Sequence, residues 1–240
     1  MNAAVLTAVR TVAETGSTNA DMAELARGGL GEGVWLRAER QSAGKGRHGR
    51  TWVSPPGNLY ASTLVRLRPG DPYAATLALV AGVSLGEAAS VFLPDAELRL
   101  KWPNDLLLGP AKLAGILLER VDDAVVVGVG ANLLHHPDLP DRATTSLAEH
   151  GAAVDAQLFA ETLAESFARW LGVWRGVGLA PVRARWLERA HPVGTALSAR
   201  LPDGSVVDGL FAGLDAEGAL LLGLADGGTR VIHAADVFLI

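Results

Sequence analysis

The chain has 240 residues, of which 49% are hydrophobic and 20% are charged, and its formal net charge is -5. This length and composition allow one large globular domain, or one domain with a small second one, and exclude a disordered chain. The acidic balance argues against a general nucleic-acid-binding protein, which usually carries a basic face. The chain has no cysteine, which excludes disulfides, thiolate zinc sites and cysteine nucleophiles.

The sequence lacks the patterns of a secreted or membrane-spanning protein. Its first 14 residues, MNAAVLTAVRTVAE, have neither the basic region nor the apolar region of a signal peptide. The apolar run at residues 124–134 is too short to cross a bilayer, which takes ~20 residues. We therefore expect a cytoplasmic protein that does not bind a membrane.

Predicted helices and strands are mixed along the chain as far as residue 190. The hydrophobic pattern predicts strands at 33–41, 59–67, 97–102, 113–120 and 124–134. Helical patterns occur at 21–29, 74–92, 156–175 and 180–190. The two apolar strands on either side of residues 121–123 are expected to pair with each other.

The pattern changes after His191-Pro192. Short apolar runs are separated there by turn sequences at 203–204, 217–218 and 226–228. Asp-Gly between apolar runs favours a hairpin, and closely spaced short strands are typical of a small β-barrel. We therefore predict two domains, residues 1–191 and residues 192–240.

The stretch GKGRHGRTW at residues 44–52 places positive charge on a glycine-rich loop. It matches the dinucleotide-binding pattern G-x-G-x-x-G, but that pattern must open a helix, and the prolines that follow oppose one. It also lacks the glycine spacing of a Walker A loop. Alternating glycines allow backbone N–H groups to converge on an anion, and arginine binds phosphate with two hydrogen bonds. We interpret the stretch as an anion-binding loop, with a solvated basic loop as the alternative.

The stretch KWPND at residues 101–105 combines a cation, an amide and a carboxylate. Pro103 ends the preceding strand, so Asn104 and Asp105 are expected in a turn. Ordinary turn chemistry explains these two residues. The same set with Lys101 also suits a magnesium-nucleotide, because magnesium takes one or two carboxylates together with phosphate oxygens.

Two apolar strands carry polar residues and glycines of interest. KLAGILLE at residues 112–119 opens with a lysine, and its Gly115 permits close approach of a ligand. GVGAN at residues 128–132 ends in an amide within an apolar stretch. A buried Asn132 needs hydrogen-bond partners, which either a ligand or the protein could supply.

Taken together, TGSTNAD (15–21), AERQSAGKGRHGRTW (38–52), KWPND, KLAGILLE and GVGAN resemble the biotin protein ligases. The resemblance covers roughly the first 135 residues, and the small C-terminal β-domain also fits. It implies an α+β fold, in which a catalytic domain with a mixed β-sheet and helices precedes an SH3-like β-barrel. The family loop usually reads G-R-G-R-R-G-R, and this chain has Lys45 and His48 at two of the arginine positions.

The resemblance implies a biotin–[acetyl-CoA-carboxylase] ligase. Such an enzyme uses ATP and Mg²⁺ to activate its substrate biotin as biotinyl-5′-AMP. It then transfers biotin to a lysine of a biotin carboxyl carrier protein. The STN motif begins at Ser17, which leaves no room for a DNA-binding helix-turn-helix. We therefore expect a ligase that does not bind DNA, as a monomer or a homodimer.

The resemblance also implies which residues form the site. Lys112 would lie between the biotin carboxylate and the α-phosphate and act in catalysis with Arg47. The expected biotin-binding residues are Ser17, Thr18, Asn19, Gln41, Gly44, Lys45, Gly46, Arg47, Lys112 and Gly115. The expected nucleotide-binding residues are Arg47, Arg50, Trp52, Lys101, Asn104, Lys112 and Asn132. Asp105 would hold magnesium. Ser17 and Thr18 also suit a helix N-cap with Asp21.

Three other functions are weighed against this one. A lipoate or octanoate ligase or transferase of related fold is the nearest, but such enzymes lack a loop of the GKGRHGR type. A nucleic-acid-binding regulator could use the basic loop and the C-terminal barrel, against the acidic net charge. A purely structural interaction module would leave Lys112, Asn132 and KWPND unexplained together.

Overall fold

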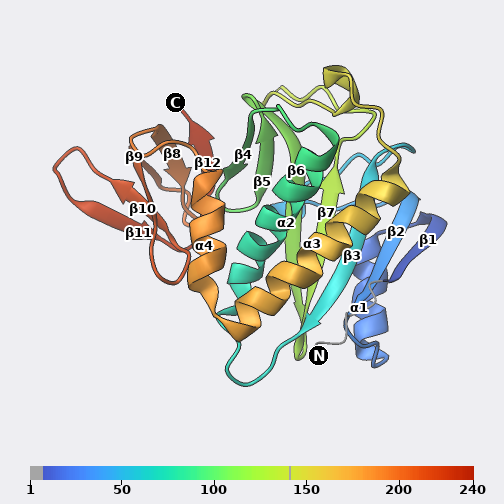
Figure 1. Cartoon of the computed structure of the whole chain (residues 1–240). Coiled ribbons are helices and arrows are strands. Elements are labelled where there is room, and N and C mark those ends of the chain that lie inside the picture. Colours follow the sequence, from blue (N-terminus) through green and yellow to red (C-terminus); the bar gives the residue numbers. More distant parts are fainter. Residues whose placement is uncertain (1–7, 141) are drawn as a thin grey trace.

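The computed structural model describes residues 8–140 and 142–240 as two β-sheets with four α-helices (Figure 1). The sequence analysis found no signal-peptide pattern in the first 14 residues, and residues 1–7 of that stretch lie outside the described residues. The strands of the large sheet are β1 Ala8–Thr15, β2 Val34–Gln41, β3 Leu59–Arg66, β4 Leu98–Lys101, β5 Asp105–Leu108, β6 Ala111–Val121 and β7 Ala124–Ala131. The helices are α1 Thr18–Arg27, α2 Leu77–Phe92, α3 Ala156–Gly176 and α4 Leu179–Glu188.

The large sheet has the order β1-β2-β3-β7-β6-β5-β4, with β1 parallel to β2 and antiparallel pairing elsewhere. The predicted hairpin is confirmed, since β6 and β7 pair down to Val121 opposite Ala124. Two strands differ from the prediction. β1 was not predicted because its mixed sequence AVRTVAET suits a largely exposed edge strand. β5 begins at Asp105, so the turn predicted to contain this residue is shorter.

The helices cover the two faces of the large sheet unequally. α2 and α3 pack on one face and enclose the main hydrophobic core. α1 packs on the other face, where Met22 contacts a small cluster that includes Leu36, Leu64 and Val126. Alternate residues of β3 and β7 belong to the two clusters, as the two-residue period of a strand requires. Because α1 is the single helix on its face in the described part of the chain, it covers that face less completely than α2 and α3 cover the other.

Residues Ala74–Phe92, which contain α2, are long and apolar enough to cross a bilayer by composition alone. However, 67% of this segment is buried inside the protein. It packs against α3 and α4 and against the strands β4 to β7. Burial on several sides explains its uniformly apolar sequence, as in the core helix of a globular domain.

The C-terminal strands are β8 Ala196–Arg200, β9 Val206–Leu214, β10 Leu220–Gly223, β11 Thr229–Ile232 and β12 Asp236–Leu239. They form an antiparallel sheet in the order β11-β10-β9-β8-β12. The predicted barrel is not closed, because no ladder joins β11 to β12 among the described residues. The sheet packs on the rest of the protein, where Trp102 donates to the Gly218 carbonyl at 3.2 Å. The domain boundary at residue 191 stays a prediction.

Candidate active site

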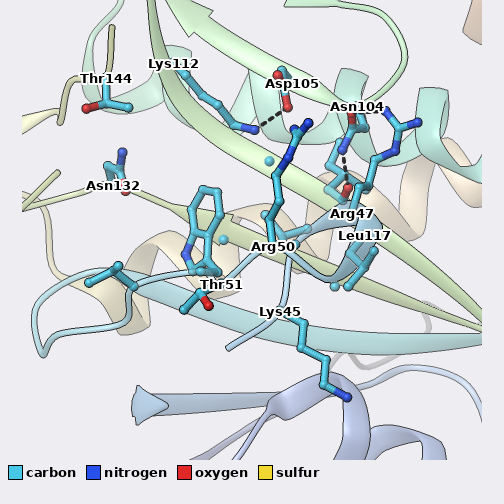
Figure 2. Close-up of a pocket in the computed structure, with 18 of the residues that line it drawn as sticks. Lys45, Arg47, Arg50, Thr51, Asn104, Asp105, Lys112, Leu117, Asn132 and Thr144 are labelled. Atoms are coloured by element: carbon cyan, nitrogen blue, oxygen red, sulfur yellow. Dashed lines mark hydrogen bonds and ion pairs between the residues drawn. The ribbon is translucent and has the colours of Figure 1, made fainter. Parts of the chain in front are cut away.

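A cavity of about 360 Å³ lies on the α1 face of the large sheet. Its wall includes Lys45, Arg47 and Arg50 of loop 44–52 (Figure 2). It also includes Asp236, at the start of β12. Most of the predicted site residues line it: Ser17, Thr18, Asn19, Gln41, Lys45, Gly46, Arg47, Arg50, Trp52, Lys101, Asn104, Asp105, Lys112, Gly115 and Asn132. The volume and the mixture of apolar and polar walls are typical of a small-molecule site.

Gly44 is the one predicted site residue that is not part of the cavity wall among the described residues. Its carbonyl accepts a hydrogen bond from the Trp52 amide at 2.9 Å. A Cβ at this position would lie 2.5 Å from the Trp52 carbonyl oxygen and 2.7 Å from Ser54 Oγ. Gly44 is therefore required for close packing at the base of the loop. Its contact with biotin stays a prediction.

One end of the cavity carries uncharged hydrogen-bonding groups. Gln41 Oε1 accepts from the Thr18 amide at 2.8 Å, and Asn19 Oδ1 accepts from Ser62 Oγ at 2.6 Å. Ser17 is the N-cap residue of α1, but its side chain makes no capping hydrogen bond. Asp21 does not form the predicted capping box, because its carboxylate accepts from Thr15 Oγ1. The buried polar groups at this end therefore serve the cavity wall more than the helix.

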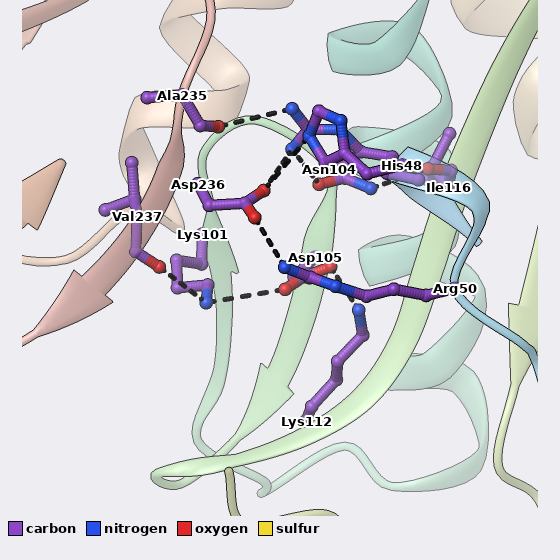
Figure 3. Close-up of polar contacts among 11 residues, drawn as sticks. His48, Arg50, Lys101, Asn104, Asp105, Lys112, Ile116, Ala235, Asp236 and Val237 are labelled. Atoms are coloured by element: carbon purple, nitrogen blue, oxygen red, sulfur yellow. Dashed lines mark hydrogen bonds and ion pairs between the residues drawn. The ribbon is translucent and has the colours of Figure 1, made fainter. Parts of the chain in front are cut away.

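The other end of the cavity is cationic. Lys112 Nζ lies 2.5 Å from one Asp105 oxygen, and Lys101 Nζ lies 3.4 Å from the other (Figure 3). Burial disfavours the ionised Asp105 carboxyl, but Lys112 and Lys101 outweigh this effect and hold its pKa below the ordinary value. Burial lowers the pKa of Lys112, and the attraction of Asp105 opposes that change. Asp105 thus fixes the position of Lys112 in the cavity wall.

Loop 44–52 is held by an acidic residue of the C-terminal sheet. Asp236, the first residue of β12, lies 2.6 Å from Arg50 and 3.5 Å from both Arg47 and His48 (Figure 3). Burial disfavours the charge on Asp236, but the guanidinium groups of Arg50 and Arg47 hold the pKa of its carboxyl below the ordinary value. The sequence analysis missed this residue, since a single aspartate at the start of a short strand carries no recognisable pattern.

Arg47 joins the loop to both β-sheets. Its guanidinium donates to Asn104 Oδ1 and to the Ala235 carbonyl, each at 3.2 Å. Lys101 makes a parallel link, because its ammonium donates to the Val237 carbonyl at 3.1 Å. Lys45 has a different position: it is exposed, and Figure 2 shows it extended away from the Lys112–Asp105 pair. The C-terminal sheet therefore forms part of the cationic end.

Trp52 lies on a floor made of glycines. A Cβ at Gly130 would approach its indole to 2.6 Å, and a Cβ at Gly115 would lie 3.4 Å from it. Lys112 Nζ is 5.5 Å from the ring centroid, within the range of a cation–π contact. The indole Nε1 is buried and has no hydrogen-bond partner among residues 8–140 and 142–240. A ligand that accepts a hydrogen bond here would remove the cost of this unpaired donor.

The remaining polar residues of the prediction are held by the protein. Asn132 is buried and donates from Nδ2 to the Thr145 carbonyl at 3.0 Å. The protein therefore supplies a partner to this amide. Among the described residues there is no group of three or more histidine, cysteine, aspartate or glutamate side chains that could hold a metal ion. Asp105, the predicted magnesium ligand, is occupied by its two lysines.

Known proteins resemble the chain over nearly its full length. Residues 18–132 match the Biotin/lipoate A/B protein ligase family, and residues 198–240 match the Biotin protein ligase C terminal domain. The Biotin--[acetyl-CoA-carboxylase] ligase of Paracoccus denitrificans is 41% identical over 239 residues, which cover 95% of this chain and 98% of that protein. The protein of the same name from Mycobacterium tuberculosis is 38% identical, over 94% of this chain and 86% of its own length.

A solved structure shares the fold. The biotin protein ligase from Aquifex aeolicus, in complex with biotin and ATP, superimposes with a TM-score of 0.86. The match covers 97% of this chain and 99% of that one at 24% sequence identity. The α+β fold predicted from the motifs is confirmed by this likeness. With the two relatives above, these findings place the chain in the biotin protein ligase family.

Proposed function

We propose that this chain is an ATP-dependent ligase that activates biotin as biotinyl-5′-AMP and transfers it to a lysine of a biotin carboxyl carrier protein. The observation that carries the proposal is the position of Lys112, between an uncharged end and a cationic end of one cavity. The relatives from P. denitrificans and M. tuberculosis are named for the biotinylation of acetyl-CoA carboxylase, which supports the carrier domain of that enzyme as the acceptor.

Biotin fits the cavity with its ring at the uncharged end. The ureido group is neutral, so its recognition depends on directed hydrogen bonds in a buried place. Thr18, Asn19 and Gln41 provide such groups. The valerate chain would then run over Gly115 toward Lys112. Gly46 and Lys45, on the loop above, would contact biotin or the adenylate.

ATP fits the cationic end. Arg47, Arg50 and Lys101 all face this part of the cavity and would contact the phosphates. Asn104 orients Arg47 by accepting its hydrogen bond. The adenine would lie near Trp52, whose unpaired Nε1 offers a donor, and near Asn132.

The first reaction brings two anions together. An oxygen of the biotin carboxylate attacks the α-phosphorus of ATP, and the bond from that phosphorus to pyrophosphate breaks. Lys112 would lie between the carboxylate and the phosphate and stabilise the charge that develops in the transition state. The amine of the acceptor lysine then attacks the acyl carbon of biotinyl-AMP, and AMP leaves. Loop 44–52 would limit the access of water to this reactive anhydride.

Magnesium is expected from the family chemistry, and the described residues fit it only in part. The carboxylates in the cavity wall are Asp105 and Asp236, and each already faces two or more cations. Magnesium in nucleotide sites rests largely on phosphate oxygens and water. We infer that Asp105 mainly positions Lys112, with magnesium held chiefly by ATP.

Three further statements stay predictions: a cytoplasmic location, the absence of DNA binding, and a monomeric or homodimeric state. The last two have direct measurements. Titration of labelled duplex DNA at low salt tests DNA binding, since an electrostatic complex is strongest there. Sedimentation at several protein concentrations, with and without biotin and ATP, gives the oligomeric state.

The test of the function is biotin-dependent exchange of pyrophosphate into ATP, with lipoate and octanoate as competing acids. We expect exchange with biotin alone, followed by transfer of biotin to a purified carrier domain. Exchange with lipoate or octanoate in place of biotin would assign the protein to the related ligases. Lack of exchange with every acid, from folded protein, would refute the proposal.

A further inference from the structure

Glu119 lies next to the cavity but is not part of its wall. It is a half-buried residue of β6, on the same face of the sheet as Gly115. Its carboxylate accepts a hydrogen bond from Asn19 Nδ2 at 2.7 Å. Asn19 is itself buried at the start of α1, 100 residues earlier in the chain. This contact fixes how the amide of Asn19 is turned, because a carboxylate can only accept.

The position of Asn19 leaves it little freedom. A Cβ on Gly128 would lie only 2.0 Å from Asn19 Oδ1, so the amide lies directly on the backbone of β7. On its other side, Asn19 Oδ1 is 2.6 Å from Ser62 Oγ. Since an amide oxygen can only accept, the single proton of the Ser62 hydroxyl must point to Asn19.

The direction of these bonds extends to Thr18. Ser62 Oγ lies 2.8 Å from Thr18 Oγ1, and with its own proton committed to Asn19 it can only accept there. The Thr18 hydroxyl proton has two acceptors within the protein, Ser62 Oγ and Gln41 Oε1, the latter at 3.2 Å. In either case the proton is used inside the protein. The lone pairs of Thr18 Oγ1 are left for a ligand.

The opposite side of the network is fixed in the same way. The carbonyl of Trp52 can only accept, so Ser54 Oγ donates to it at 2.9 Å. Ser54 then accepts from Gln41 Nε2 at 3.1 Å, which turns Gln41 Oε1 toward Thr18. The network thus ends at two groups that can only accept, the Glu119 carboxylate and the Trp52 carbonyl. Thr18 lies between them.

We propose that Glu119 is a positioning residue that sets the direction of this hydrogen-bond chain, so that the Thr18 hydroxyl accepts from biotin and does not donate to it. The proposal rests on the function proposed above, with the ureido ring at Thr18. The chain would then select a ring N–H at this point. A ring atom that carries only lone pairs would be rejected, because Thr18 has no proton to offer it.

The test compares biotin with two analogues in which one or the other ureido N–H is replaced by a ring oxygen. Glu119→Gln keeps the shape but can present an NH₂ group to Asn19 Oδ1, which permits the bonds from Asn19 to Ser62 to reverse, so that Ser62 donates to Thr18. We expect KM for biotin to rise about fivefold, because one directed hydrogen bond weakens, with KM for ATP unchanged. Wild type should bind poorly the analogue whose ring oxygen replaces the N–H that faces Thr18. In Glu119→Gln, the ratio of the KM for this analogue to the KM for biotin should fall by a similar factor. Loss of a residue that only supports the fold would raise the KM for biotin and the KM for the analogue together, and would leave their ratio unchanged.

Ser62→Ala breaks the same chain without changing Glu119, and it should reduce the ratio as well. Glu165→Gln, at an exposed carboxylate on α3, is the matched control and should change neither quantity. Thermal unfolding of each variant checks the fold. An unchanged ratio in both chain variants would overturn the role of Glu119. If Thr18→Val also leaves the KM for biotin unchanged, the ureido ring does not bind at Thr18. The proposed binding mode of biotin would then be wrong.

Discussion

The two ends of the cavity use different physical means of recognition. At the Thr18 end, buried side chains hold one another through short hydrogen bonds between neutral groups, closed at one side by Glu119. At the loop end, recognition depends on charge: Arg50 is about half exposed and is paired with Asp236 of the other domain. Lys112 lies between the two and is paired with a buried aspartate.

This difference follows from the ligands that each end is proposed to bind. A neutral ring offers no net charge, so selectivity requires donors and acceptors whose directions are fixed before binding. Phosphates attract cations over a longer range and tolerate less exact geometry. The uncharged end should therefore be sensitive to small changes of shape, and the loop end to changes of charge.

The largest effect is expected where the two ends meet. Lys112→Ala removes the ammonium proposed to stabilise the transition state, and we expect the rate of biotin-dependent ATP–pyrophosphate exchange to fall about 100- to 1000-fold. Lys45→Ala removes an exposed lysine of the loop and should cost less than about tenfold, since an exposed charge is largely screened.

Lys112→Ala also leaves the buried Asp105 with one cation fewer, which could lower stability. The double variant Lys112→Ala/Asp105→Asn removes this unpaired charge. It should unfold at a higher temperature than Lys112→Ala and remain inactive. Recovery of exchange in the double variant would contradict a catalytic role for Lys112.

The next effect tests the rigidity of the uncharged end with the same substitution at two glycines. Gly128→Ala places a methyl group 2.0 Å from Asn19 Oδ1, so the amide must move. We expect a loss of about 1–3 kcal/mol in the free energy of unfolding, as for overpacking in a core, and a raised KM for biotin. At the loop end, a Cβ on Gly46 would meet no atom closer than 3.5 Å, and its backbone φ of -109° suits any residue.

Gly46→Ala should therefore change stability by less than about 0.5 kcal/mol, as for a substitution away from the core. Urea unfolding of the two variants and the wild type measures the difference. Equal losses at the two positions would mean that the uncharged end is no more rigid than the loop.

The motif residues were predicted because each motif is contiguous in sequence. Thr18, Asn104 and Lys112 lie in short sequence motifs whose residue types suit one chemistry, and all three line the cavity. Asp236 and Ser62 lie in none of these motifs, and Glu119 ends the KLAGILLE motif without a predicted role. All three were missed for a physical reason: their roles arise only when distant segments pack together. The Arg50–Asp236 contact, for example, joins residues 186 positions apart.

The glycines show a similar limit. Gly115 was predicted to allow a ligand close to the backbone, and the GVGAN glycines lie on the strand paired with it. Gly128 instead makes room for Asn19, and Gly130 makes room for Trp52. The pattern indicated close approach, but the partner is a side chain of the protein. Likewise, turn sequences predicted the strands of the C-terminal sheet but not whether its end strands meet.

The smallest effect concerns the contact that joins the loop to the C-terminal sheet. A carboxyl whose pKa is lower in the folded protein stabilises it at pH values above the ordinary pKa of 3.8, and this contribution disappears as the pH falls through the lower folded value. Asp236→Asn should therefore reduce stability by about 0.5–1 kcal/mol at neutral pH, the range of partly exposed ion pairs. The difference from wild type should shrink as the pH falls below 3.8 and vanish below the folded pKa of Asp236.

Thermal unfolding of wild type and Asp236→Asn over this pH range provides the measurement. Asp208→Asn, at an exposed position of β9 in the same sheet, is the control and should unfold with the wild type at every pH. A deficit of Asp236→Asn that persists unchanged into acid would show that the carboxylate charge is not what holds the loop. The attachment would then rest on Arg47, whose hydrogen bonds to Asn104 and to the Ala235 carbonyl do not depend on Asp236.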